Sequence, residues 1–146
     1  MPAAIGAALA SDGRAVCVTG DGSLALNVHE LATLAELDLD VVIVLFDNRH
    51  LGLVRQQQTL FYGQRLQACA FERHTDFVAA ARGFGVEACA WRPGVDSVSE
   101  LQRLLQQRGP RLIGVPLTAA EMVPPGAGNC EMLGIRAASA PASGGL

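Results

Sequence analysis

Short runs of apolar residues alternate along the chain with segments whose apolar residues recur at helical spacing. The short runs are rich in β-branched residues, which predicts buried strands, and they cover residues 15–19, 41–46, 86–91 and 111–117. The segments with helical spacing cover residues 2–10, 24–37, 76–84 and 97–107. This alternation predicts an α/β fold, an open parallel sheet flanked by helices around one core.

The last predicted helix has the clearest boundary signals. Ser97 or Asp96 can cap its N-terminus, and Arg108 and Gly109 stand at its C-terminal end. Its predicted buried face consists of Val98, Leu101, Leu104 and Leu105. The first predicted helix, at 2–10, is apolar enough to resemble a signal-peptide core. No basic residue precedes it, so we expect a cytoplasmic protein.

A glycine-rich turn joins the first predicted strand to the helix after it, and it consists of Gly20, Asp21, Gly22 and Ser23. Backbone N–H groups and a helix N-terminus face one point here, an arrangement that suits phosphate oxygens. Gly20 and Gly22 allow close backbone approach, and Ser23 can donate to a phosphate or cap the helix. Asp21 adds a carboxylate oxygen of the kind that Mg²⁺ prefers.

A second polar turn follows the strand predicted at 41–46, where Asp47 and Asn48 come directly after the last apolar residue. If the two strands are parallel neighbours, both turns lie at one edge of the sheet, where open α/β sheets bind ligands. Asp21 and Asn48 are 27 residues apart, about the length of one β-α-β crossover. The two turns predict a site for a diphosphate and its Mg²⁺.

Other interpretations of the first turn remain open on the residues alone. An isolated Gly-Asp-Gly is also an ordinary turn. Nucleotide sites fit less well, because the sequence contains neither the dinucleotide pattern Gly-x-Gly-x-x-Gly nor the Walker pattern.

The two turns resemble the signature of thiamine-diphosphate-dependent enzymes. In that family an Asp, an Asn and a backbone carbonyl two residues beyond the Asn hold the Mg²⁺ that anchors the cofactor diphosphate. Further blocks look like the C-terminal domain of the acetolactate synthase catalytic large subunit, and they cover residues 27–33, 51–58, 60–62 and 122–127. The resemblance extends over residues 2–135.

The resemblance implies a role for each matching residue. The metal ligands are Asp21, Asn48 and the backbone carbonyl of His50. The cofactor-binding residues are Gly20, Asp21, Gly22, Ser23, Asn48, His50, Gly52 and Leu53.

Leu53 and Gln57, which follow the second turn, have more specific expected roles. The resemblance makes Leu53 the apolar side chain beneath the bent cofactor, whereas the residues alone equally allow a core leucine. Gln57 stands where some family members carry a tryptophan that favours 2-oxobutyrate, so pyruvate is the expected acceptor. Nearby Arg55, Phe61, Tyr62 and Arg65 either cover a carboxylate site or form an exposed loop with solvated arginines.

Composition excludes several classes of partner. The formal net charge is −3 and 17% of the residues are charged, so neither nucleic acid nor an anionic membrane is expected as a partner. Cysteines stand at positions 17, 69, 89 and 130 without Cys-x-x-Cys spacing. Reduced thiols, not a zinc site, are therefore expected.

The chain is expected to have three parts. Residues 1–117 form the cofactor-binding α/β domain. Residues 118–135 are proline-rich, and the resemblance implies that they form a lid over the active site. Residues 136–146 lack periodicity and are expected to be disordered. In the family a strand and a glycine-rich segment precede the first helix, so the resemblance also implies an N-terminally truncated domain.

The resemblance implies a transferase reaction in branched-chain amino acid biosynthesis: pyruvate is decarboxylated and joined to a second 2-oxoacid to give 2-acetolactate. The family places a proton-relaying glutamate on a separate pyrimidine-binding domain, and FAD only in the full-length enzyme. No catalytic residue is therefore assigned in this chain, and neither Glu30 nor Glu36 takes the glutamate's role. Expected partners are a complementing pyrimidine-binding domain, further copies of the chain and a regulatory small subunit.

Two alternatives to a part of acetolactate synthase remain open. One is another thiamine-dependent decarboxylase of 2-oxoacids, because the diphosphate signature is widely shared. The other is a non-catalytic remnant that binds thiamine diphosphate without turnover.

Overall fold

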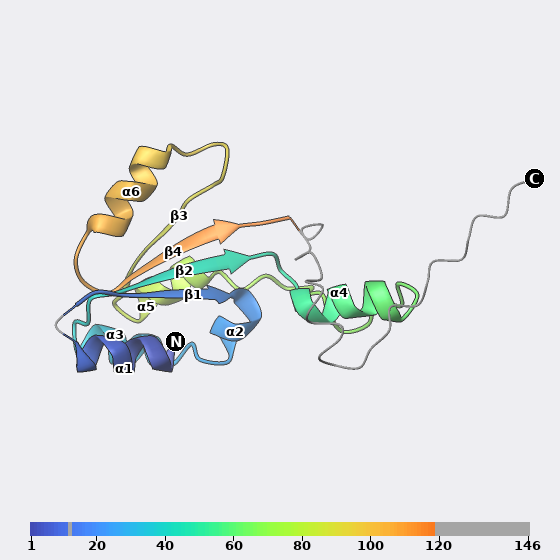
Figure 1. The fold of residues 1–146 in the computed structure, drawn as a ribbon, viewed down its shortest axis with the longest axis horizontal. Helices are drawn as coiled ribbons and strands as arrows, with labels where there is room; N and C mark the ends of the chain where they lie inside the picture. The colour runs from blue at the N-terminus through green and yellow to red at the C-terminus, as the bar shows by residue number, and fades with distance from the viewer. Residues whose placement is uncertain (12, 119–146) are drawn as a thin grey trace, which may run out of the picture.

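The computed structural model describes residues 1–11 and 13–118 (Figure 1). The lid predicted for 118–135, apart from Thr118, and the disordered tail predicted for 136–146 lie outside the described residues. Within them no helix is both long and apolar enough to cross a membrane.

The predicted parallel sheet is confirmed. Its strands lie in the order β1-β2-β4-β3 and every neighbouring pair is parallel. The strands are β1 (Ala15–Gly20), β2 (Val41–Asp47), β3 (Glu87–Ala90) and β4 (Arg111–Pro116). The helices are α1 (Pro2–Ala10), α2 (Asp21–Ala25), α3 (Glu30–Glu36), α4 (Gly52–Phe61), α5 (Phe77–Gly83) and α6 (Val98–Gln106).

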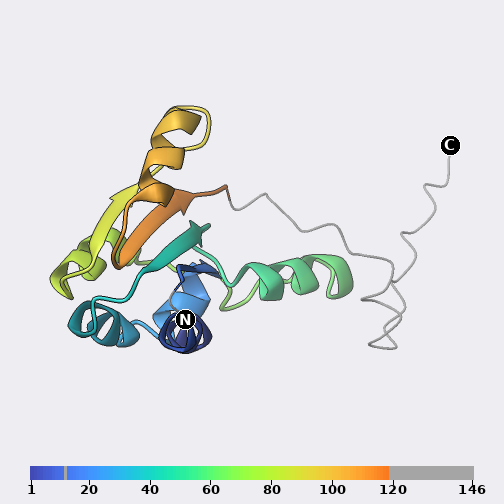
Figure 2. The same cartoon turned by 60° about the vertical axis from the view of Figure 1, so that its left-hand side comes forward.

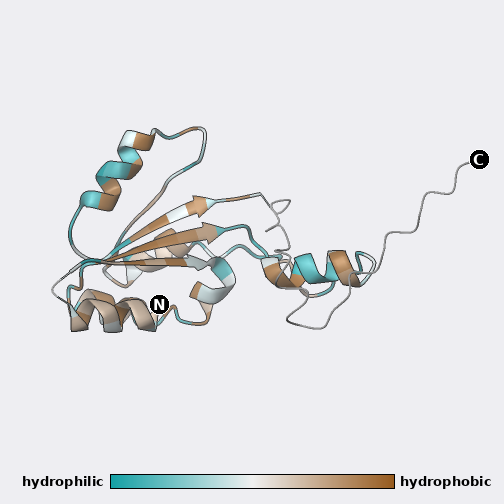
Figure 3. Ribbon diagram, in the orientation of Figure 1, coloured by the Kyte–Doolittle hydropathy of each residue, from teal (hydrophilic) through white to brown (hydrophobic). Residues whose placement is uncertain are grey.

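Helices cover both faces of the sheet, as the doubly wound pattern requires (Figure 2). The larger core joins Ile43 and Leu112 of the sheet to α1, α3 and α5, where Leu31 and Leu34 are fully buried. The smaller core lies on the opposite face, where Leu104 of α6 packs over β2 and β4. The strands are hydrophobic along most of their length, as buried parallel strands are (Figure 3).

One part of the second face has little cover. Val16 and Val18 of β1 point to that face and remain 56% and 65% exposed. Since α6 lies over β2 and β4, β1 presents an apolar surface there.

A cluster around Asp40 connects the start of β2 to other elements. Asp40 accepts hydrogen bonds from Arg14, Arg108 and the backbone N–H of Gly109. Arg14 also donates to the carbonyls of Leu105 and Gln107 at the end of α6. Burial would raise the pKa of Asp40, but the two arginines outweigh it and the pKa is lowered.

Three local expectations need correction. The helical run predicted for 24–37 is divided into α2 and α3, because residues 27–31 make tighter hydrogen bonds, such as Asn27 N–H to the Leu24 carbonyl at 2.9 Å. An exposed loop was one expectation for Arg55, Phe61, Tyr62 and Arg65, but Arg55 and Phe61 lie in α4, which contains no buried residue, and Tyr62 and Arg65 follow that helix. Val98, predicted on a buried face, is 67% exposed because it occupies the first position of α6.

The structure decides between Ser97 and Asp96 as the N-cap of α6. The Ser97 hydroxyl accepts from the Glu100 N–H at 3.2 Å, so Ser97 is the N-cap of α6. Asp96 instead pairs with Arg92.

Candidate functional site

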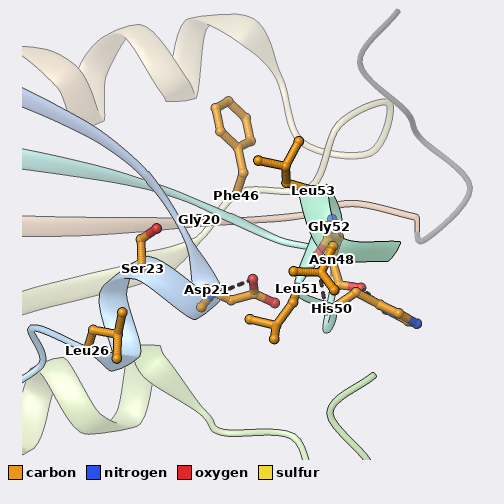
Figure 4. Close-up of a pocket in the computed structure, with 12 residues that line it drawn as sticks. Gly20, Asp21, Ser23, Leu26, Phe46, Asn48, His50, Leu51, Gly52 and Leu53 are labelled. Carbon is orange, nitrogen blue, oxygen red and sulfur yellow. Dashed lines mark hydrogen bonds between the residues drawn. The ribbon is translucent and has the colours of Figure 1, made fainter. Parts of the chain in front are cut away.

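The register of β1 and β2 brings the two polar turns together. Gly20 pairs with Phe46, so the chain leaves both strands at the same edge. A hollow of about 390 Å³ lies between the turns and contains all eight predicted cofactor-binding residues (Figure 4). Its lining consists of Gly20, Asp21, Gly22, Ser23, Leu26, Phe46, Asn48, His50, Leu51, Gly52, Leu53 and Val54.

Asp21 is the buried charged residue of the site. Its side chain points toward the turn that carries Asn48 (Figure 4). It is 4% exposed, and its Oδ1 accepts from the N–H of Gly22 at 2.8 Å. Its Oδ2 is buried without a hydrogen-bond partner among the described residues. A buried oxygen of this kind costs stability unless a ligand satisfies it.

Burial is the largest cause of a raised pKa at Asp21, and the nearby Asp47 carboxylate raises it further. The backbone N–H groups of Gly22 and Arg49 lower the pKa and so oppose this rise. A cation bound to the orphaned oxygen would favour the ionised form, because opposite charges stabilise one another in a site shielded from water.

The second turn is held by its own side chains. Asn48 Oδ1 accepts from the N–H of His50 at 3.0 Å, and the His50 ring Nδ1 lies 2.8 Å from the Asn48 carbonyl. A carbonyl only accepts, so Nδ1 is the donor. The His50 imidazole points away from Asp21 (Figure 4).

Two glycines leave the space that the site needs. A Cβ on Gly22 would lie 2.8 Å from Leu51 Cδ2, and a Cβ on Gly52 would lie 2.9 Å from Asn48 Nδ2. Gly52 also begins α4, so the unpaired N–H groups of that helix face the hollow. A helix N-terminus favours negative charge, including phosphate.

The positions of Leu53 and Gln57 in α4 can be compared with the roles expected for them. Leu53 is 69% exposed and lines the hollow, so the core-leucine alternative is wrong. Gln57 is exposed and lies outside the lining, one turn or more along α4. Four apolar residues that were not predicted as site residues also line the hollow: Leu26, Phe46, Leu51 and Val54. Their apolar character in a strand or helix carries no signal that distinguishes a ligand wall from a core.

The chemistry of the site suits a hard cation beside a phosphate. A carboxylate, an amide oxygen and a backbone carbonyl are oxygen donors of the kind Mg²⁺ takes. In the described part of the chain no group of three or more His, Cys, Asp or Glu residues is placed to hold a metal ion. Cys17, Cys69 and Cys89 are free thiols.

The fold defines an α/β domain, and the hollow at the carboxyl edge of its parallel sheet is a candidate site for a phosphate-type ligand. Comparison with protein families gives the particular family. The model described as "Thiamine pyrophosphate enzyme, C-terminal TPP binding domain" matches residues 1–115. The chain belongs to this family.

Curated relatives make the resemblance more specific. The chain is 48% identical to the acetolactate synthase isozyme 1 large subunit of Escherichia coli (strain K12), over 92% of this chain and 25% of that protein. It is 40% identical to the probable acetolactate synthase large subunit of Methanococcus aeolicus, over 86% of this chain and 22% of that protein. The resemblance to acetolactate synthase large subunits is thereby confirmed, and the chain spans about a quarter of their length.

Solved structures agree on the fold. The thiamine diphosphate-dependent 4-hydroxybenzoylformate decarboxylase of Rhodococcus jostii RHA1 superposes with a TM-score of 0.70 at 28% identity, over 81% of this chain and 22% of that one. The benzoylformate decarboxylase of Polynucleobacter necessarius superposes with a TM-score of 0.72 at 26% identity, over 84% and 24% of the two chains.

Proposed function

We propose that the chain is the diphosphate-binding part of a thiamine-diphosphate-dependent acetolactate synthase, with Mg²⁺ held by Asp21, Asn48 and the carbonyl of His50. The observation that carries this proposal is the buried Asp21 Oδ2, which lacks a partner among the described residues and faces the Asn48 turn. A divalent cation would satisfy it and would neutralise the diphosphate at the same point.

The other residues of the hollow would position the cofactor. The N–H groups at the start of α4 would bind diphosphate oxygens, together with the Ser23 hydroxyl. Leu53, exposed into the hollow, would press against the cofactor and exclude water from the reacting carbon. Thiamine diphosphate, when bound, supplies the electron sink for decarboxylation of a 2-oxoacid.

The overall reaction in this proposal joins the two-carbon unit of pyruvate to a second 2-oxoacid, giving 2-acetolactate for branched-chain amino acid synthesis. Gln57, further along α4, would favour pyruvate as acceptor. The proton relay would come from a glutamate of a pyrimidine-binding domain, on a longer form of this chain or on a partner. FAD and a regulatory small subunit would belong to the complete enzyme, which we place in the cytoplasm.

The surface around the site supports a partner domain. Leu26, Leu53 and Tyr62 are 80%, 69% and 58% exposed, and Leu26 and Leu53 line the hollow itself. Exposed apolar side chains that surround a ligand site are a feature of interfaces. The pyrimidine-binding domain is the occupant that the proposal requires, and the chain alone is then expected to lack turnover.

Isothermal titration calorimetry tests the cation site. The full chain should bind thiamine diphosphate in the presence of Mg²⁺, and Asp21→Ala should abolish the heat signal. Glu36→Ala, an exposed carboxylate on α3, should bind like the parent. Binding by Asp21→Ala as tight as the parent's would refute the metal assignment.

A second candidate function follows from the solved structures, whose names describe decarboxylases of benzoylformate and its 4-hydroxy derivative. In that case the reaction would end with release of an aldehyde. A product assay with pyruvate, after complementation with a pyrimidine-binding domain, separates the two. Acetolactate supports the first function and acetaldehyde the second.

A further inference from the structure

The segment that follows α4 returns to the turn formed by residues 47–50, which we call the metal turn because it carries two of the proposed metal ligands. Two backbone hydrogen bonds pair the segment with the turn. The Leu51 N–H donates to the Cys69 carbonyl at 2.8 Å, and the Phe71 N–H donates to the Arg49 carbonyl at 2.9 Å. Three residues further on, His74 Nε2 lies 2.7 Å from Asp47 Oδ2. A carboxylate accepts only, so the imidazole is the donor. One segment thus contacts the turn through both its backbone and a side chain.

Asp47 connects this contact to the backbone of the turn. Its Oδ1 accepts from the Arg49 N–H at 3.2 Å while its Oδ2 receives His74. Arg49 has a φ of 59°, the left-handed region that a residue with a side chain adopts at a cost. The Asp47 carboxylate therefore helps to hold a strained residue between Asn48 and His50.

The Asp47–His74 pair is well placed to act on the cation site. The Asp47 side chain is 16% exposed and the His74 side chain 37% exposed. Asp21, Asp47 and His74 line one small hollow beneath the metal turn. The Asp47 carboxylate already lies close enough to Asp21 to raise the pKa of that residue. The position of the Asp47 side chain therefore affects the charge at the cation site.

We propose that His74 is a positioning residue for the cation site and that it acts through the carboxylate of Asp47. By donating to Oδ2 it fixes the Asp47 side chain, which in turn fixes the Arg49 backbone and the direction of the His50 carbonyl. Outer partners of this kind orient metal ligands without touching the metal. The inference rests on the proposed function, since it requires a divalent cation at Asp21 and Asn48.

Mn²⁺ binding to the full chain, followed by electron paramagnetic resonance in the presence of thiamine diphosphate, tests the proposal. His74→Ala should weaken Mn²⁺ binding by about tenfold or more, the usual effect of removing an outer partner. His74→Gln, whose amide can donate to the same oxygen, should restore most of the affinity. His29→Ala is the matched control, because the His29 side chain is 74% exposed and belongs to a different pair.

Two further measurements distinguish positioning from a general loss of structure. The thermal midpoint without metal should be nearly equal for His74→Ala and the parent. In a double-mutant cycle, His74→Ala should have little further effect once Asp47→Ala is present, because its influence passes through that carboxylate.

The outcomes separate this inference from the proposed function. Parent-like Mn²⁺ affinity in His74→Ala, or equal effects with and without Asp47, would overturn the positioning role while Asp21→Ala still abolishes binding. Mn²⁺ binding that survives Asp21→Ala would overturn the proposed cation site and this inference with it.

Discussion

Replacing Asp21 by Asn should stabilise the chain when no divalent cation is present. The substitution keeps the shape of the side chain and removes a charge that is 4% exposed and incompletely satisfied. An Asn amide at the Oδ2 position can also donate to the neighbouring Asp47 carboxylate. Sites built for ligands commonly cost stability in this way.

The magnitude follows from the unsatisfied oxygen. Leaving a buried polar atom without a partner costs about 1–3 kcal/mol. For a domain near this size, 1–3 kcal/mol corresponds to a rise in Tm of roughly 3–10 °C. The gain should depend on pH, because burial raises the pKa of Asp21 in the folded chain. The penalty is present above that raised pKa and fades as the pH falls toward the ordinary value of 3.8.

Scanning calorimetry in EDTA at pH 7 and near pH 4 measures this difference. Asp38→Asn is a suitable control, because Asp38 is exposed and its φ of 46° is one that Asn also adopts. With Mg²⁺ and thiamine diphosphate added, the parent should gain stability and Asp21→Asn should not. A lower Tm for Asp21→Asn in EDTA at pH 7 would refute the reasoning.

Three further substitutions, the last with a matched control, test other parts of the structure. Gly52→Ala places a Cβ 2.9 Å from Asn48 Nδ2, so Mn²⁺ affinity should fall about tenfold while Tm stays near the parent's; unchanged affinity would show that the Asn48 side chain moves without consequence. Asp40→Asn removes the negative charge that pairs with two arginines and replaces one of its two acceptor oxygens by an NH2 group. It should cost about 1–2 kcal/mol in urea unfolding at pH 7. Because the pKa of Asp40 is lowered, that difference is present above the ordinary aspartate value and should disappear as the pH falls through the lowered pKa; a constant difference down to pH 2 would contradict this. Leu34→Ala, at a fully buried position, should cost about 2–5 kcal/mol, whereas Leu37→Ala, at a position 50% exposed, should cost far less by the same urea titration.

The sheet and the candidate site were predictable from sequence for a common reason. Strands such as β2 are continuous apolar runs, and their ends are marked by polar residues. Once the strands are parallel neighbours, Asp21 and Asn48 must meet at one edge. The eight predicted cofactor-binding residues lie in the two turns and at the start of α4. Local pattern was sufficient to bring the two turns together, whereas the roles predicted for His50, Gly52 and Leu53 depended on the family resemblance.

The features that were missed depend on contacts between distant residues. The division between α2 and α3 lies in a stretch with uninterrupted helical spacing, and hydrogen bonds of the tighter type decide it. The pairing of His74 with Asp47 spans 27 residues across an irregular segment. Val98 has the spacing of a buried position but is exposed, because it lies at the first position of α6. Helical periodicity alone does not show that a residue at a helix end is uncovered.

The lack of buried residues in α4 has a consequence for local stability. Hydrogen bonds join this helix and the residues before it to the segment that follows. Cys69 and Phe71 pair with the backbone directly before α4. The Gln58 side chain donates to the Gln67 carbonyl and accepts from the Gln67 N–H. A helix held in this way opens with far less free energy than β2, whose Val41, Val42 and Ile43 are fully buried. Amide hydrogen exchange should therefore be fast in α4 and slow in the sheet. A ligand bound at Gly52 would slow exchange mainly in this helix, so occupancy of the proposed site would increase the local order of α4.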